Sequence, residues 1–589
     1  MENKVTLAQT NSEQVNQSYQ NKPYNPYIKS KKIYKPMDKK DIVFMIVFLI
    51  ISFLLVDFAF CNGFHLGFTI FYFILFIAST IYISQQNKQV PVFSAVCGAL
   101  SLLGSITFAL YSDYFINSIM FVLIGGLYTL YCIGISCGFN HKQGSFKILI
   151  DLILSAFAYP FKNIPEFFGS AKSSAKKNKR SLNGMVGAAV AIPVLVVIIP
   201  LLIKSDAAFE GLVSTIAKNI GIYLLEFLFA VVIAPYIFSF VFGKRKNINK
   251  KKKEYSDAKS KKLPVSACSS FLSVISLTYL VYLFSQLAYF FSAFKGFLPD
   301  GYEYSASVFA RRGFFEMFII SIINIAIISG VSMFAKKKSL PVKFLSLFIS
   351  LFSVLLIVTA MQKMRLNISI YGLSKNRLLV CVFMIMLLVI IAFFIIHIFA
   401  PKISYMQPII IICSAMFIVL SFADVDAQIA KYNINAYESG RIDELDIDSI
   451  VNLSDSAVEY LLQLSQSEDT AVSIKADRAV INKIRYVYYD SLKLDNGKSE
   501  YADSYDFRQY HYSKDNACRA IADYINALKE DDREKFMSLY QFETGDYEYS
   551  EDENAYYLYG TDYISVYTFD NKKGMYELSE KNEYDYNID

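Results

Sequence analysis

The sequence predicts an all-α polytopic membrane bundle of about eleven transmembrane helices, followed by a mainly α-helical soluble C-terminal domain with a few terminal strands. Three observations support this prediction. Of the 589 residues, 54% are hydrophobic and 19% are charged, whereas a typical soluble chain has about 25% charged residues. Up to residue 423, apolar runs of about 20 residues recur almost without charge, and each is long enough to span a hydrocarbon core. After residue 423 no comparable run occurs, and acidic residues dominate.

These patterns divide the chain into three parts. Residues 1–40 form a polar tail, which we expect to be disordered and cytoplasmic, residues 41–423 form the transmembrane bundle, and residues 424–589 form an acidic extracytoplasmic domain. The predicted spans cover residues 41–60, 64–83, 91–111, 115–137, 183–203, 220–242, 265–291, 315–335, 342–361, 378–399 and 407–423.

The charge distribution predicts the orientation. Residues 1–423 carry 41 Lys and Arg against 16 Asp and Glu, whereas residues 424–589 carry 17 against 36. The basic residues flank the spans, so they indicate membrane topology and anionic lipids at the cytoplasmic loops rather than nucleic acid. With a cytoplasmic N-terminus, 32 of the 41 basic residues face the cytoplasm, and an odd number of spans places the C-terminus outside. The absence of Trp and the many Lys, Asn, Ile and Tyr residues are typical of an AT-rich bacterial genome, so we expect a multi-pass protein of a bacterial cell membrane.

One connection is itself apolar. Residues 146–168 are interrupted by Asp151, Pro160 and Pro165. This pattern predicts an amphipathic helix on the cytoplasmic membrane surface. The alternative is a twelfth, short or re-entrant span, which would invert the orientation of everything after it.

Motifs that would define an enzyme are weak or missing. Residues 134–138 (GISCG) satisfy the pattern of a hydrolase nucleophile elbow, but they end a membrane span instead of joining a strand to a helix. Their small side chains favour helix packing. The sequence has no GxxxxGK[ST], HExxH or CxxC motif, and its four histidines are scattered. It therefore favours a non-enzymatic protein without a cofactor or a metal site.

Two ionisable side chains fall within predicted spans. Charged groups at membrane depth are costly, and for that reason they are functional candidates. Glu226 lies about six residues into its span, and Asp57 lies near the outer end of the first span. Glu226 is the better candidate for a proton or ion role, although a hydrogen bond between packed helices would also explain it.

Several short stretches together carry a family resemblance. They are residues 309–316 (FARRGFFE), 364–366 (MRL), 371–373 (YGL), Arg377, 423–424 (AD), 429–434 (IAKYNI), 445–446 (LD), 453–458 (LSDSAV) and, more weakly, 507–520. Their order and spacing resemble the bacterial membrane families catalogued as domains of unknown function (the 4153/4173 group), over roughly residues 200–525. The resemblance implies many spans and a soluble end domain, and it supplies no reaction. Lys431 stands where the family more often has Arg.

The external arginines and the start of the acidic domain form a candidate anion or docking site. Its members are Arg311, Arg312, Glu316, Arg365, Arg377, Asp424 and Asp426. In the first interpretation, the arginines pair with these carboxylates or with lipid headgroups and dock the C-terminal domain on the bundle. In the second, they bind a phosphate or another anion, because clustered arginines suit bidentate phosphate recognition.

These interpretations give three candidate functions. The first is a non-enzymatic envelope scaffold or sensor with an external helical domain and an unidentified envelope partner. The alternative is a transporter or lipid-handling protein that uses the anion site at the outer face, and a second alternative is a membrane-embedded transferase. The sequence shows no internal repeat of the transporter kind, which favours the first.

Overall fold

The structure is a computed structural model. It describes residues 37–84, 90–136, 139, 146–177, 198, 207–246, 263–295, 314–334, 339–401, 403–442, 445–489, 491–495, 498–501, 506–545, 547–550, 554–559, 563–570 and 575–583. The predicted tail 1–40 and the predicted span 183–203 lie almost entirely outside these residues.

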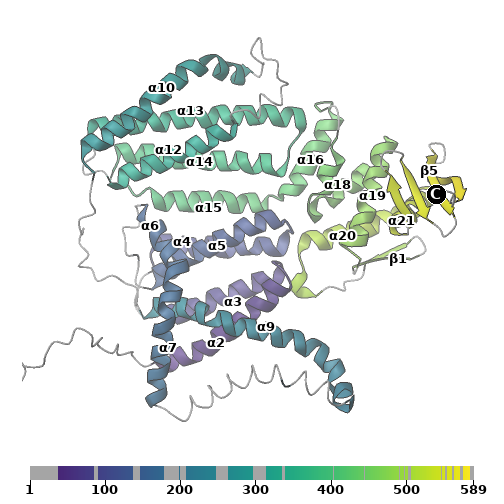
Figure 1. The fold of residues 1–589 in the computed structure, drawn as a ribbon, viewed down its shortest axis with the longest axis horizontal. Coiled ribbons are helices and arrows are strands. Elements are labelled where there is room, and N and C mark those ends of the chain that lie inside the picture. The colour runs from purple at the N-terminus through teal and green to yellow at the C-terminus, as the bar shows by residue number, and fades with distance from the viewer. Residues whose placement is uncertain are drawn as a thin grey trace, which may run out of the picture.

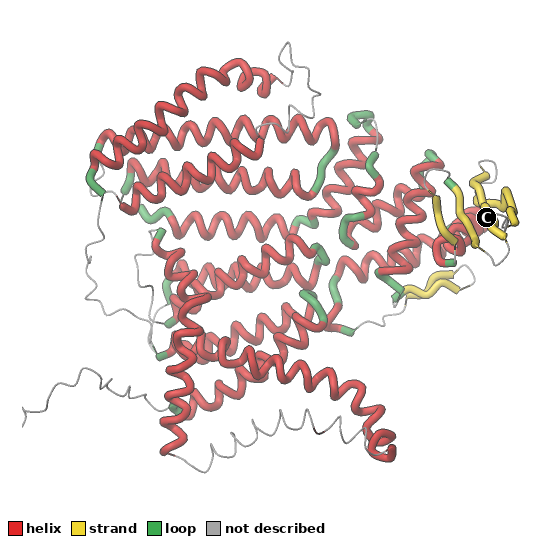
Figure 2. Tube along the Cα trace, viewed as in Figure 1, coloured by secondary structure: helices red, strands yellow, loops and turns green. Residues whose placement is uncertain are grey.

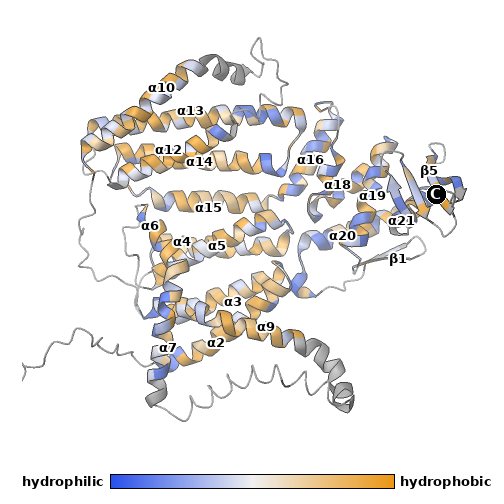
Figure 3. Ribbon diagram, in the orientation of Figure 1, coloured by the Kyte–Doolittle hydropathy of each residue, from blue (hydrophilic) through white to orange (hydrophobic). Residues whose placement is uncertain are grey.

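Long apolar helices make up most of the chain, as expected where no water is available to satisfy the backbone (Figures 1 and 3). The first group of helices comprises α2 (Lys39–Leu55) with the π-helical turn η1 (Val56–Cys61), α3 (Leu66–Ile83), α4 (Val92–Leu110), α5 (Tyr114–Ile135) and α9 (Ala207–Arg245). The second group comprises α10 (Val265–Lys295), α12 (Phe314–Phe334), α13 (Leu340–Tyr371) and α14 (Lys375–Phe399). Helix α15 (Met406–Phe422) packs between the groups, against α4 and α5 on one side and α14 on the other.

The described residues contain nine helices that are long and apolar enough to cross a membrane. The number is ten if α15 and the next helix, α16 (Val425–Glu438), form one span bent by 63°. Helix α12 holds a shorter apolar segment, Glu316–Ser332. The chain is therefore a multi-pass α-helical membrane protein, as the sequence predicts.

One of the nine helices runs in a different direction from the others. The continuous segment α6 (Lys147–Ile153), η2 (Leu154–Ala158) and α7 (Tyr159–Lys177) qualifies as a span by length and composition. It nevertheless runs across the ends of the neighbouring helices (Figure 1).

Polar and aromatic contacts hold this crossing segment on the end of α9. The Tyr236 hydroxyl donates a hydrogen bond to the Ala156 carbonyl over 2.6 Å, and Lys244 Nζ donates to Ser155 Oγ over 2.8 Å. Phe167 packs against Phe238 of α9. This arrangement is the one expected of a helix that lies on a membrane surface.

The residues after α15 form a C-terminal region, Val425–Glu583, at one end of the bundle. We call the helix ends that contact it the docking face and the other ends the opposite face. The helical elements of the C-terminal region are α16, α17 (Ile447–Val451), η3 (Asp455–Ala457), α18 (Val458–Ser465), α19 (Thr470–Tyr486), η4 (Phe507–Gln509), α20 (Tyr512–Ala527) and α21 (Glu530–Thr544). In the sequence, Ala517, Ile521 and Ile525 recur at helical spacing, which predicts a helix, and they lie on α20.

The strands of the C-terminal region gather mainly at the end farthest from the bundle (Figure 2). An antiparallel hairpin joins β1 (Leu492–Asp495) and β2 (Lys498–Tyr501), and an antiparallel sheet has the order β3 (Tyr547–Ser550), β4 (Ala555–Tyr559), β5 (Tyr563–Asp570) and β6 (Met575–Glu583). Residues 556–569 are aromatic and β-branched, which predicts strands, and they lie mainly on β4 and β5. The acidic residues at the end of the chain predict a frayed end, and strand β6 corrects this expectation, because it pairs along β5 and places Tyr576 beside Phe569.

Gly134 occupies a close contact between α4 and α5. A Cβ atom built there would lie 2.0 Å from Ser94 Oγ. The Ser136 hydroxyl donates a hydrogen bond to the Ile133 carbonyl. Residues 134–136 therefore pack two helices together, as their small side chains indicate.

We predict that Gly134→Ala lowers the thermal stability of the detergent-solubilised protein, because overpacking a close contact costs about 1–3 kcal/mol. Gly125→Ala in the same helix is the matched control, since a Cβ there meets nothing within 4 Å. The control should be neutral or slightly stabilising. Equal unfolding temperatures for both variants would contradict the close packing of α4 on α5.

Candidate functional site

The candidate site is the junction between the C-terminal region and the docking face. Arg508 makes the first ion pair of this junction. In η4, the Asp506 side chain caps the turn by accepting a hydrogen bond from the Arg508 backbone N–H at 2.9 Å, and its other oxygen accepts from Arg508 Nε at 2.8 Å. Arg508 Nη1 then pairs with Asp57 of η1, a residue that is only 5% exposed. This pair ties the C-terminal region to the end of α2.

A glycine and two further hydrogen bonds fit η4 closely onto the bundle. A Cβ at Gly67 would lie 3.1 Å from the Arg508 carbonyl oxygen, so the first turn of α3 can approach that backbone only without a side chain. The Leu66 N–H donates to the Tyr510 carbonyl at 3.0 Å, and Gln509 Nε2 donates to Asn62 Oδ1 at 3.1 Å. The contact is therefore continuous along the η1–α3 connection.

The second ion pair joins three helices through Lys375. Its Nζ lies 2.8 Å from Asp113 Oδ2 and 3.0 Å from Asp426 Oδ1. Asp113 also caps α5 by accepting from the Phe115 and Ile116 N–H groups. Asp426, in the first turn of α16, is 2% exposed and accepts from the Ser454 N–H at 2.8 Å. One lysine thus compensates two buried carboxylates, one from α5 and one from the C-terminal region.

The side-chain amide of Asn433 completes this part of the junction by pairing with the backbone of Leu373. The Asn433 amide accepts from the Leu373 N–H at 2.7 Å and donates to the Leu373 carbonyl at 2.8 Å. Gly372 has φ +72°, and a Cβ there would lie 2.6 Å from Asn433 Oδ1. Glycine is therefore needed both for the left-handed backbone and for the approach of Asn433.

Asp455 forms a third polar contact. It accepts hydrogen bonds from Ser112 Oγ at 2.8 Å and from the Tyr488 hydroxyl at 2.6 Å. His511 Nε2 lies 3.7 Å from it, and the His511 ring stacks on His65 with 4.9 Å between centroids. Burial lowers the pKa of His511 to about 4, so this imidazole is neutral at pH 7. His511 therefore adds no positive charge beside the stacked His65 ring.

Of the predicted site residues, Asp426 and Asp57 lie within the junction itself. Asp424 has φ 50° at the bend between α15 and α16, and burial raises the pKa of its carboxyl group. Arg377 Nη1 donates to the carbonyls of Tyr371 and Gly372 at 3.0 and 2.7 Å, so it caps the end of α13.

The remaining predicted residues are distributed elsewhere. Glu316 and Arg365 are exposed on α12 and α13, whereas Arg311 and Arg312 lie outside the described residues. Glu226 of α9 is 4% exposed and shares a hydrogen bond with the Cys61 thiol beside Asp57.

Sequence reasoning missed the cations that complete the junction. Lys375 is one of four basic residues in a predicted external loop. The positive-inside rule expects few basic residues in such a loop. Arg508 was visible in the weakest of the stretches that carry the family resemblance. Nothing in the sequence around Asp113 indicates an ion pair, because its partner Lys375 lies 262 positions later in the chain.

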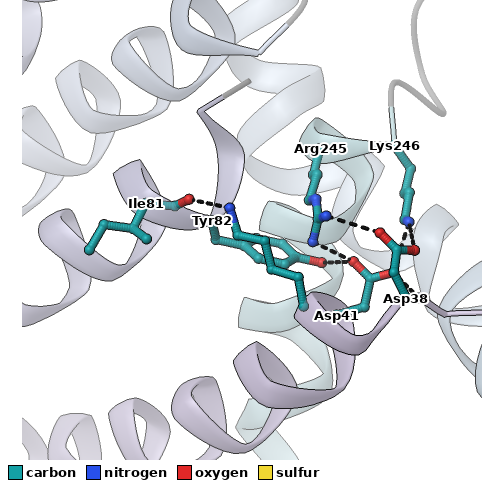
Figure 4. A network of polar contacts seen from close by, with 7 residues as sticks. Asp38, Asp41, Ile81, Tyr82, Arg245 and Lys246 are labelled. Atoms are coloured by element: carbon teal, nitrogen blue, oxygen red, sulfur yellow. Dashed lines mark hydrogen bonds and ion pairs between the residues drawn. The ribbon is translucent and has the colours of Figure 1, made fainter. Parts of the chain in front are cut away.

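A separate polar cluster closes the opposite face (Figure 4). The fully buried Asp41 pairs with Arg245 and Lys246 of the α9 end at 2.7 Å each and accepts from the Tyr82 hydroxyl at 3.0 Å. Asp38 pairs with the same two cations, which hold the pKa of its carboxyl group below the usual value against the opposing effect of burial. These contacts fix α2, α3 and α9 to one another.

The fold and the junction define a class of protein. It is a multi-pass α-helical membrane protein whose C-terminal region, made of helices and antiparallel strands, is fixed to one end of the bundle. Within that class, the chain belongs to the family described as "Domain of unknown function (DUF4153)", which matches residues 98–464, more than half of its length. No curated protein and no solved structure matches it. Three of the stretches that carried the resemblance lie at the junction, because 371–373 contacts 429–434 through Asn433 and 453–458 contacts Asp426 through Ser454.

We predict that Lys375→Met loosens α16, because Asp113 and Asp426 then lose their shared cation. Removing one partner of a buried ion pair costs about 3–5 kcal/mol. Trypsin should cut faster after Lys431, an exposed residue inside α16 that resists cleavage while the helix is folded. Arg365→Met is the matched control, since Arg365 is exposed on α13, and it should leave the cleavage rate unchanged. Equal cleavage rates in the two variants would show that Lys375 does not hold the junction.

Proposed function

We propose that the protein is a non-enzymatic scaffold or sensor of the cell envelope, in which the C-terminal region clamps two groups of membrane helices. The observation that carries this proposal is the Lys375 ion pair. It connects Asp113 at the start of α5, in the first helix group, with α14 in the second group and with Asp426 of the C-terminal region. A displacement of α16 therefore acts on both helix groups at once.

The other contacts of the junction support the same function. The Arg508 pair and the hydrogen bond from Leu66 bind the C-terminal region to the first group, and the Asn433 amide binds it to the second. Because these anchors lie on different elements, the C-terminal region cannot swing about a single hinge. The C-terminal region either holds the two helix groups in one arrangement or moves when their arrangement changes.

Eleven spans with the N-terminus in the cytoplasm fit the helices best. The crossing segment α6–α7 is then a surface helix, and α12 and α15 count as spans, whereas the predicted span 183–203 lies outside the described residues. The docking face and the C-terminal region are outside in this topology, which also agrees with the excess of basic residues in the predicted cytoplasmic loops.

The crossing segment suits an anionic lipid surface. Phe157, Phe161 and Phe168 are exposed on it, as are Lys162 and Lys172. Exposed aromatic rings beside lysines are typical of helices at the headgroup boundary. We therefore propose anionic lipids as partners at the opposite face.

A transporter or lipid-handling function has less support. Such a function needs either a solute-sized cavity or an assembled anion site. Two cavities at the described membrane helices, one beside Asp113 and one near His397, hold about 10 Å³ and about 40 Å³, whereas small-molecule sites have roughly 300–1,000 Å³. Arg377 caps a helix and Arg365 is exposed, so the described arginines do not converge on one anion.

The topology is tested with an impermeant thiol reagent on intact cells. The native Cys518 does not serve as the reporter, because its side chain is fully buried. In a Cys61→Ser background, Glu459→Cys on the exposed side of α18 should be labelled from outside, since the C-terminal region is extracytoplasmic in the proposal. Lys172→Cys on α7 is the control and should be labelled only after the membrane is opened. The reverse pattern would overturn the proposed orientation and the sensor function with it.

A further inference from the structure

The C-terminal region holds a pocket of about 410 Å³, which the junction does not use. Helices α18, α19, α20 and α21 and the last strands of the sheet contribute to its walls. The volume is within the usual range of small-molecule sites, roughly 300–1,000 Å³. It is also several times larger than the cavities described in the bundle.

The lining combines three kinds of side chain. Hydroxyl groups come from Ser465, Ser467, Thr470, Ser473 and Ser538, aromatic rings from Tyr524, Phe536, Phe569 and Tyr576, and charges from Asp477, Asp532 and Lys535. Hydroxyl and carboxylate groups bind the polar atoms of a ligand, while the ring faces accept its apolar faces and attract a cation. This combination suits a compact ligand that is both hydroxylated and positively charged.

Asp477 is the central charged group of the lining. The Tyr524 hydroxyl of α20 lies 3.5 Å from it, and Ser465 of α18 also hydrogen-bonds to it. Burial raises the pKa of its carboxyl group to about 7, and the negative charge of Asp532 adds to the effect. An acid in this setting gains a compensating charge when a cation binds beside it.

Among the described residues, the cations near Asp477 pair with other groups. Lys535 pairs with Asp532 on α21 at 3.5 Å. Arg478, which follows Asp477 on α19, lies 3.6 Å from the centre of the Tyr549 ring and pairs with Glu543. Strand β6 contributes Met575 and Tyr576 to the lining, neither of which is charged. No described cation pairs with Asp477, so the pocket can offer this carboxylate to a cationic ligand.

We propose that this pocket binds a small hydroxylated amine of the amino-sugar class, with the ammonium group on Asp477 and the sugar ring against the aromatic side chains. The ligand would be the signal of the proposed sensor, so in this respect the inference rests on the proposed function. Binding itself is independent of the orientation in the membrane, so the failure of one proposal is distinguishable from the failure of the other.

Three sugars with the same pyranose ring test the charge requirement, and glucose is the one that matches glucosamine in shape. We expect the detergent-solubilised full chain to bind glucosamine at pH 7 at least tenfold more tightly than glucose or N-acetylglucosamine in titration calorimetry, because only the first carries an ammonium group. Affinity for glucosamine should also weaken by more than tenfold between pH 7 and pH 5. Asp477 becomes protonated over that range while the amine stays charged.

Two variants separate the pocket from a general effect. Asp477→Asn keeps the side-chain shape and should bring glucosamine to the affinity of glucose. Ser538→Phe fills the pocket from α21 and should abolish the binding of all three sugars. Equal affinities for glucosamine and glucose in the parent protein, absence of binding, or unchanged preference in Asp477→Asn would overturn the proposal.

Discussion

A carboxylate buried at the end of a membrane helix must have a cation, and this constraint determines how the molecule is assembled. Asp57 ends the first span inside the protein, where an unpaired charge would cost several kcal/mol. Its partner Arg508 lies 451 positions later in the chain. The bundle and the C-terminal region are therefore completed by each other: without the C-terminal region the bundle has an unpaired acid, and without the bundle Arg508 loses its buried partner.

The same constraint recurs at Lys375, where it has a mechanical consequence. Two carboxylates and one lysine bring together α5, α14 and α16, and close packing at Gly372 leaves Asn433 no room to shift. Interactions of this kind have well-defined geometry, so they transmit a displacement rather than absorb it. A ligand that changes the packing of α18 to α21 would act on the membrane helices through these anchors. The pocket beside Asp477 lies among those helices.

The sequence predicted those parts of the fold that depend on local pattern. Apolar runs predicted the described spans, helical spacing predicted α20, and aromatic and β-branched residues predicted β4 and β5. It also selected Asp426 and Asp57, because acidic residues near apolar spans are conspicuous. It could not select Arg508 or Lys375 as their partners, since pairing across 451 positions for Asp57 and 51 positions for Asp426 leaves no local periodicity. Strand β6 was missed for a related reason: its many charged residues suggest a solvated tail, and only pairing with β5 makes it a strand.

The central claim, that paired charges at the helix ends lock the C-terminal region to the bundle, is tested most directly by exchanging one pair. Spin labels at Phe60→Cys on η1 and Asp523→Cys on α20, both exposed and in a Cys61→Ser background, report the distance between the two parts. The account predicts a narrow distance distribution in the parent, a broad one in Asp57→Arg and in Arg508→Asp, and a narrow one again when both changes are combined. A distribution that stays narrow in both single variants would contradict it.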